Sequence, residues 1–386
     1  MFISKENKIN CYCYILFGLY FIINLSFYGY GIYFLESFKI PYIVIGITIG
    51  VSALITSILQ PVLGRFIDVH HYSWQKILLI LNLIIIISVI LMSLTQLYIL
   101  FFSLILIAST GMYPFVVNSV FYYESYGIKT NFGVARGFGA LTFCIFSFIL
   151  GFALNDSGVW ILLLLTLISS ILMIITIFLL PDYGFSQKEQ NEKSKSNILT
   201  KYPAFALLLI SMVMFMTFQN MFECYMIDII ENVGGSVVNV GISNSISSVL
   251  EIPVMFLFLK ILKRVPAKNL IMIAGIFYIF RAFLIFQAHD TFGIYLSQVF
   301  QMLTFAIISP ATVHFTNEMM EDIDQYEGQA LLGSTITIGL IFANFVGGNV
   351  LQFYNINILL IILIVLTVIG FVFAFLTNIF KNKHAY

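Results

Sequence analysis

Two ionisable residues, Glu251 and Arg281, lie inside long apolar stretches of the sequence. An ionisable side chain in the middle of a membrane helix costs about 2.5 to 3.5 kcal/mol, so such a residue is expected to have a function. Burial favours the neutral form of a carboxyl, which suits a group that binds and releases a proton. We predict that Glu251 and Arg281 form a buried pair that a proton breaks. A static pair that only fixes helix packing is the alternative.

A second set of candidates consists of polar side chains, mostly amides, within the apolar stretches. Amides offer both hydrogen-bond donors and acceptors, which suits a hydroxyl-rich solute such as a sugar or a nucleoside, although they also often bridge membrane helices. Glu36 and Glu223 lie toward the ends of their stretches, and we interpret them as surface charges. The candidate solute contacts are Asn24, Tyr28, Asn118, Gln219, Asn220, Asn244, Gln298 and Gln301.

The composition requires lipid around these residues. Of the 386 residues, 60% are hydrophobic and 9% are charged, whereas a soluble domain carries about 25% charged residues. The apolar stretches are about as long as the 20 residues that cross a bilayer, and lipid requires them to be helical. We predict twelve transmembrane helices near 11–35, 41–64, 77–95, 97–121, 133–154, 158–180, 203–227, 236–259, 267–287, 290–315, 328–351 and 355–380.

The sequence divides and repeats near its middle. The only long hydrophilic segment, 182–202, predicts a linker between bundles at 1–181 and 203–386. Gly50–Gln60 (GVSALITSILQ) is similar to Gly241–Glu251 (GISNSISSVLE), which indicates two related six-helix halves. A weaker echo pairs small residues that let helices approach closely, namely Gly133, Ala135 and Gly139 with Gly328, Ala330 and Gly333.

Lys and Arg placement predicts the orientation. With the N-terminus inside, all but two of the 18 Lys and Arg residues fall on the cytoplasmic side; Lys39 falls outside and Arg281 within a span. We therefore expect both termini in the cytoplasm and the chain in the cell (plasma or inner) membrane. We interpret the acidic residues Glu318, Glu321, Asp322, Asp324 and Glu327 as a solvated charge run. Docking onto the linker lysines or Lys260–Lys268 is the alternative.

Three motifs resemble a known family. Gly64-Arg65-Phe66-Ile67-Asp68, followed by Lys76, resembles a degenerate form of the major facilitator signature in the loop between helices two and three. Tyr126-Gly127 and Phe132–Gly139 (FGVARGFG) resemble the start of the fifth helix in the lactose permease-like branch. Leu250–Phe256 (LEIPVMF), then Lys263-Arg264 and Arg281, resemble its eighth and ninth helices.

The resemblance implies an all-α membrane protein with the major facilitator fold, twelve transmembrane helices in two six-helix bundles, working by alternating access. It implies a sugar-binding role for Arg136, a proton-site role for Arg281, and a cytoplasmic gate of Gly64, Arg65, Asp68 and Lys76.

Several positions depart from the lactose permease pattern. The carboxylate partner of the sugar-binding arginine falls on Asn118, and the seventh-helix aspartate falls on Gln219. The tenth-helix histidine and glutamate fall on Gln301 and Thr304. Lactose specificity and its proton relay therefore do not carry over, and Glu124 is a substitute partner for Arg136.

The predicted function is secondary active transport of a small polar solute, coupled to H⁺ as symport. Export of hydrophobic compounds and a non-transporting membrane sensor are the alternatives. No GxxxxGK loop, HExxH or GxSxG motif occurs, which disfavours ATP-driven transport and catalysis. The four cysteines lack metal-ligand spacing. We expect a monomer with a solute, H⁺ and lipid as its partners, and no cofactor, metal or nucleic acid.

Overall fold

The computed structural model describes residues 5–70, 72–183 and 198–379, and all the regular secondary structure in these ranges is helical. Twelve helical segments in this part of the chain are long and apolar enough to cross a membrane, which confirms the predicted number. They run over Glu6–Gly29, Tyr42–Ile67, Trp74–Leu94, Tyr98–Ser125, Phe132–Ser157, Trp160–Leu179, Pro203–Cys224, Val237–Leu262, Ala267–Phe286, Thr291–Met319, Glu327–Phe353 and Ile356–Ile379.

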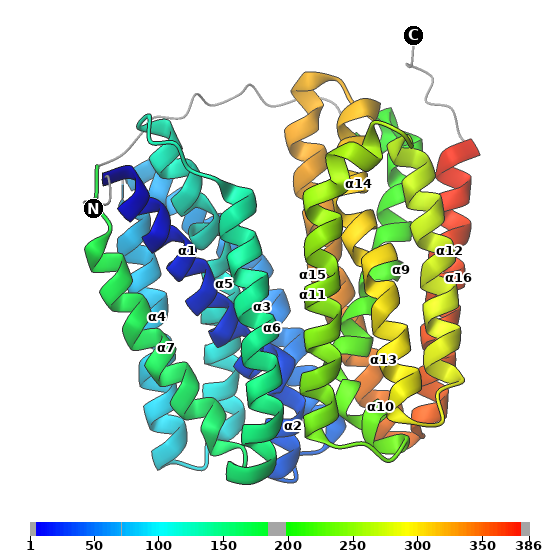
Figure 1. Cartoon of the computed structure of the whole chain (residues 1–386), viewed down its shortest axis with the longest axis horizontal. Helices are drawn as coiled ribbons and strands as arrows, with labels where there is room; N and C mark the ends of the chain where they lie inside the picture. The colour runs from blue at the N-terminus through cyan, green and yellow to red at the C-terminus, as the bar shows by residue number, and fades with distance from the viewer. Residues whose placement is uncertain (1–4, 71, 184–197, 380–386) are drawn as a thin grey trace. The chain divides into compact units, whose positions relative to one another are not determined.

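The chain separates into two compact units (Figure 1). One comprises residues 1–188 and 240–248, and the other comprises residues 189–239 and 249–386. The first contains the six N-terminal spans: α1 (Lys5–Asn24) with η1 (Leu25–Gly29) and α2 (Gly31–Ser37), α3 (Tyr42–His70), α4 (Trp74–Leu94), α5 (Tyr98–Ser125), α6 (Phe132–Ser157) and α7 (Trp160–Leu179).

The C-terminal half begins with the short α8 (Ile198–Lys201). Its spans are α9 (Pro203–Cys224) with α10 (Met226–Asn232), α11 (Val237–Leu262), α12 (Ala267–Phe286), α13 (Thr291–Val299) with η2 (Phe300–Leu303) and α14 (Phe305–Met319), α15 (Asp322–Phe353) and α16 (Ile356–Ile379). In the second unit α9 packs against α15 and α16, and α12 packs against α16 and α14.

Local sequence sets several helix starts. Asn131 caps α6, because its side chain accepts a hydrogen bond from the backbone of Val134. Asp290 caps α13 in the same way through Gly293, and Ser236 and Asn239 form a reciprocal capping box at α11. These caps fix where the helices that carry the site residues begin.

Three spans are interrupted. The first passes through a π-helical segment at Leu25–Gly29 and breaks at Tyr30, and the seventh breaks at Tyr225. The tenth narrows to a 3₁₀ segment at Phe300–Leu303 and breaks at Thr304, where φ is −103° and ψ is −94°. Such irregular turns inside helices often mark functional positions.

Two helix boundaries differ from the sequence prediction. Gly64–Asp68 was predicted as a loop but forms part of α3, which continues to His70. Helix α15 begins at Asp322 rather than near 328, so part of the acidic run is helical. Charged residues indicate where a span leaves the lipid, but they do not end a helix, so hydropathy alone does not locate these helix ends.

Candidate functional site

Arg281 is the centre of a polar cluster within the second unit. Its side chain on α12 is 0% exposed. The guanidinium donates hydrogen bonds to four side chains: Gln219 on α9 at 3.0 Å, Gln298 on α13 at 2.7 Å, Thr304 at 3.4 Å, and Gln301 on η2. Neutral amide and hydroxyl oxygens therefore surround this buried charge, as a buried cation requires.

Two glutamines extend the cluster to carboxylates on both sides. Gln301 donates from its amide nitrogen to Oε1 of Glu251 on α11 at 2.7 Å. Gln219 donates from its amide nitrogen to Oε1 of Glu223, one turn later on α9, and to Gln301 at 3.3 Å. We call this chain of residues, Glu223–Gln219–Arg281–Gln301–Glu251, the carboxyl relay.

The interruption of the tenth span positions the relay. Gln298 is the second-last residue of α13, Gln301 lies in the 3₁₀ turn, and Thr304 is the residue at the break. A regular helix would turn these three side chains by 100° per residue, so the tighter 3₁₀ turn, with three residues per turn, brings them onto one face. All three side chains are buried and reach Arg281 from there.

Aromatic rings complete the surroundings of Arg281. The guanidinium carbon lies 5.8 Å from the centre of the Phe218 ring and 5.1 Å from that of Phe222, both within the range of cation–π attraction. Among the described residues no acceptor reaches its Nε atom, which leaves one buried donor available.

The predicted link between Glu251 and Arg281 runs through Gln301 in this structure. Glu223, which we interpreted as a surface charge, instead accepts a hydrogen bond from Gln219 and belongs to the relay, so that interpretation was wrong. Gln219 and Glu223 are four residues apart, and this spacing places them on one helix face. That spacing was the sequence signal for Glu223.

In the first unit, Arg136 on α6 donates to the hydroxyl of Tyr113 on α5 at 2.9 Å. The Tyr113 ring lies 5.5 Å from that of buried Tyr20 on α1. Tyr113 was not predicted from the sequence as a partner of Arg136. The suggested partner Glu124 is exposed near the end of α5, and Asn118 lies half-buried between Tyr113 and Glu124 on the same helix.

Two predicted solute contacts occupy different settings. Asn24 is the last residue of α1, directly before the π-helical segment, and is half-buried. Asn220 is buried and donates to the backbone oxygens of Met216 and Ile336, at 2.8 and 3.3 Å. The second bond joins α9 to α15, so Asn220 bridges two helices.

The predicted cytoplasmic gate remains a prediction. Gly64 and Arg65 lie near the end of α3, and exposed Lys76 lies in the first turn of α4. The Lys76 ammonium is 5.2 Å from the centre of the Tyr72 ring. The side chain of Asp68 lies outside the described part of the structure.

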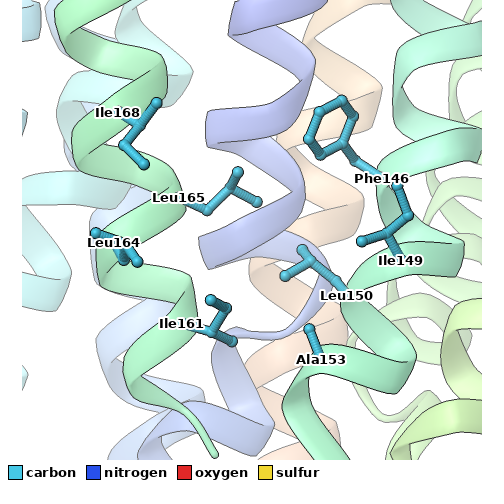
Figure 2. A pocket seen from close by; sticks show the side chains of 8 residues that line it. All are labelled: Phe146, Ile149, Leu150, Ala153, Ile161, Leu164, Leu165 and Ile168. Atoms are coloured by element: carbon cyan, nitrogen blue, oxygen red, sulfur yellow. The ribbon is translucent and has the colours of Figure 1, made fainter. Parts of the chain in front are cut away.

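Figure 2 shows a groove between α6 and α7 in the first unit. It is lined only by apolar side chains, including Phe146, Leu150, Ile161 and Leu165, and offers nothing to orient a polar solute. Several of the side chains that line it, such as Ile149 and Leu164, are exposed on the protein surface, as lipid-facing side chains are. Among the described residues, no cluster of His, Cys, Asp or Glu has the arrangement of a metal site.

Comparison with known proteins identifies the fold's family. A model of the MFS_1 like family matches residues 12–339. The chain belongs to this family. It is thus a multi-pass membrane protein of the major facilitator type, a transporter family that acts on small-molecule substrates. No curated protein matches it in sequence.

Solved structures share the fold at low sequence identity. The crystal structure of the nucleoside transporter NupG has 18% identity and a TM-score of 0.76, covering 97% of this chain and 100% of that chain. An inward-facing bacterial homologue of the human lysosomal transporter Spinster has 15% identity and a TM-score of 0.68, covering 97% and 98%. The POT family transporter PepTSo has 10% identity and a TM-score of 0.72, covering 98% of both chains.

Proposed function

We propose that this protein is a secondary active transporter that moves a small polar solute, of the sugar or nucleoside class, together with H⁺ across the cell membrane by alternating access. The observation that carries this proposal is the hydrogen-bonded link from Arg281 through Gln301 to Glu251. Both ionisable residues lie within membrane spans, where a charge without a function is disfavoured.

The link offers a physical basis for coupling. When Glu251 is ionised, its charge is attracted to Arg281 through the oriented Gln301 amide. A proton on Glu251 removes that attraction and weakens the restraint between α11 and the broken tenth span. A conformational equilibrium that depends on this restraint would then respond to protonation.

The solute class is supported by the polar chemistry of both units. Arg136 with Tyr113 in the first unit, and Gln219 with Gln301 in the second, present donors and acceptors that suit hydroxyl groups. The fold similarity to a nucleoside transporter makes nucleosides the first class to test.

The test is solute-driven proton uptake by the purified protein in liposomes. A panel of nucleosides, sugars and aromatic acids is added outside, and the external pH is recorded for the wild type, Glu251→Gln and Glu231→Gln. Glu231 is an exposed carboxyl of the second unit and serves as the matched control. We expect one solute class to alkalinise the outside, with at least a tenfold smaller response in Glu251→Gln and an unchanged response in Glu231→Gln.

Solute exchange without a pH gradient separates coupling from transport. We expect Glu251→Gln to retain exchange of labelled solute, because the amide keeps an acceptor for Gln301. Coupled uptake by Glu251→Gln at the wild-type level would refute the role of Glu251. Exchange by the wild type without proton movement would leave transport standing and exclude H⁺ coupling. Movement of hydrophobic compounds alone would favour the exporter.

A further inference from the structure

The carboxyl relay contains one guanidinium and two carboxyls. Arg281 lies at its centre, and Glu223 and Glu251 lie at its two ends. All three residues belong to membrane spans of the second unit. With both carboxyls ionised the relay therefore carries one more negative than positive charge.

The orientation of the two glutamines is the same on both sides. Gln219 and Gln301 each direct an amide oxygen to Arg281 and an amide nitrogen to a carboxylate. This orientation matches a positive charge at the centre and negative charge at both ends. Glu223 and Glu251 are thus equivalent in their hydrogen-bonded connection to one arginine.

Charge balance makes the two carboxyls dependent on each other. Arg281 compensates one carboxylate, and a second ionised carboxyl in a membrane span has a high electrostatic cost unless it is paired. A proton on either carboxyl makes the relay neutral. Neither carboxyl side chain is fully enclosed by the protein.

The other ionisable groups on the surrounding helices can be named. On α12 the buried Tyr278 accompanies Arg281, and Lys268 lies in the first turn. Helix α11 carries Lys260 in its last turn, α13 carries Tyr295, α9 ends at Cys224, and α16 contains no ionisable residue. Helix α10 carries Asp228 and Glu231 beyond the break at Tyr225, and α14 carries His314 and Glu318 in its C-terminal half. Those of α15 lie in its first six residues, and Lys201 of α8 pairs with that end of α15. Hydrogen bonds place Arg281 in the relay as the cation between the two glutamines.

We propose that Glu223 is a second proton-binding group, and that Glu223 and Glu251 share one proton through the carboxyl relay. The proposal rests on the proposed proton coupling and assigns its proton to a pair of residues rather than to Glu251 alone. Occupancy of the proton at one end leaves the carboxylate at the other end paired with Arg281 through its glutamine.

Infrared difference spectroscopy of the full chain in liposomes tests this without any solute. The protonated-carboxyl carbonyl stretch is followed during a pH titration of the wild type, Glu223→Gln, Glu251→Gln and Glu231→Gln. We expect a wild-type signal of one carboxyl per protein near neutral pH. Either relay variant should lose it, because the remaining carboxylate is then balanced by Arg281, and Glu231→Gln should keep it.

Two results would overturn the proposal. One is a Glu223→Gln signal with the wild-type amplitude and pH midpoint, and the other is an undiminished signal in Glu251→Gln. If Glu223→Gln does not fold, Glu223→Asp, which keeps a carboxyl at this end of the relay, takes its place. A shared proton requires a shifted pH midpoint in Glu223→Asp, and a midpoint equal to that of the wild type would overturn the proposal.

The infrared and transport experiments can refute the shared proton and the proposed symport independently of each other. Loss of the signal in Glu223→Gln without solute-driven proton movement would support the shared proton and refute symport. Solute-driven proton uptake that needs Glu251, with Glu223→Gln unchanged in both assays, would support symport and refute the shared proton.

Discussion

Arg136 and Arg281 differ in how much of their hydrogen-bonding capacity is used. Arg281 is wholly buried and donates to four side chains, whereas Arg136 is half-buried and donates to Tyr113. An arginine has five N–H donors. Arg136 therefore retains N–H donors beyond the one that Tyr113 accepts. In the proposed transporter these donors bind the solute, and Tyr113 orients them from the neighbouring helix.

We expect Tyr113→Phe to weaken solute binding about tenfold. A hydrogen bond to a charged group contributes about 1.5 to 3 kcal/mol, and part of that is lost when Arg136 is no longer oriented. The measurement is the solute dissociation constant of purified protein. Tyr354→Phe, at a strongly exposed position, is the control and should bind as the wild type does. Unchanged affinity in Tyr113→Phe would show that Tyr113 does not orient Arg136 for binding.

Close packing between helices depends on particular glycines. A Cβ added at Gly339 of α15 would lie 2.7 Å from backbone and Cβ atoms of Met216 and 2.8 Å from the backbone nitrogen of Thr217 on α9. A Cβ at Gly139 of α6 would lie 2.6 Å from the ring of Phe21. At Gly333, which the sequence echo paired with Gly139, a Cβ would meet no described atom within 4 Å. A Cβ at Gly139 would therefore clash with a neighbouring helix, whereas one at Gly333 would have room.

Gly339 and Gly333 lie on the same helix, α15, and provide a matched pair of variants. Gly339→Ala should destabilise the protein by about 1 to 3 kcal/mol, because the α9 backbone cannot yield as a side chain does. Gly333→Ala should be neutral or slightly stabilising, since alanine favours a helix over glycine. Chemical denaturation in detergent measures both variants. Equal stability of the two would contradict the packing between α9 and α15.

Side-chain hydrogen bonds hold the chain just before and just after residues 184–197. Before it, the Tyr122 hydroxyl donates to Asp182 at 3.1 Å, and Tyr123 donates to the backbone oxygen of Pro181 at 2.8 Å. After it, Lys201 donates to Asp324 at 2.6 Å and to Glu321 at 2.8 Å. The side chain of Asp324 is 0% exposed and pairs with Lys201 of the predicted linker. The interpretation of the whole acidic run as solvated was therefore wrong, and this part of the run follows the docking alternative.

The ion pairs of Lys201 with Asp324 and Glu321 predict how the stability of the protein depends on pH. Hydrogen bonds to Asp324 and then Glu321 raise the pKa of Lys201, and burial raises the pKa of Tyr202, whose hydroxyl donates to Asp324 at 2.8 Å. A raised folded-state pKa contributes stability that is complete below the unfolded value of about 10.4 for lysine and is lost as the pH rises through the folded value.

We therefore expect Lys201→Met to lower the melting temperature by the same amount at every pH between about 6 and 9. Thermal melts in detergent across that range provide the measurement, with Lys76→Met at an exposed position as the control. A difference between wild type and Lys201→Met that changes markedly within the range would contradict the assignment. Proton coupling near neutral pH would then have to include this ion pair.

The sequence by itself determined the solvent, the number of spans and the fold class. Long apolar stretches cannot fold in water, and lipid leaves the helix as their backbone structure, so composition and length were sufficient. It also singled out Arg281, Glu251, Gln219, Gln298 and Gln301, since polar residues inside apolar stretches are visible without coordinates.

Only the tertiary structure decided how these residues connect. Hydropathy does not show that the tenth span narrows to a 3₁₀ turn at Phe300–Leu303, and that turn directs Gln298 and Gln301 to Arg281. It likewise does not reveal that Tyr113 holds Arg136 or that Glu223 joins the relay. Side-chain partners on different helices depend on helix rotation and local breaks, and packing in three dimensions sets both.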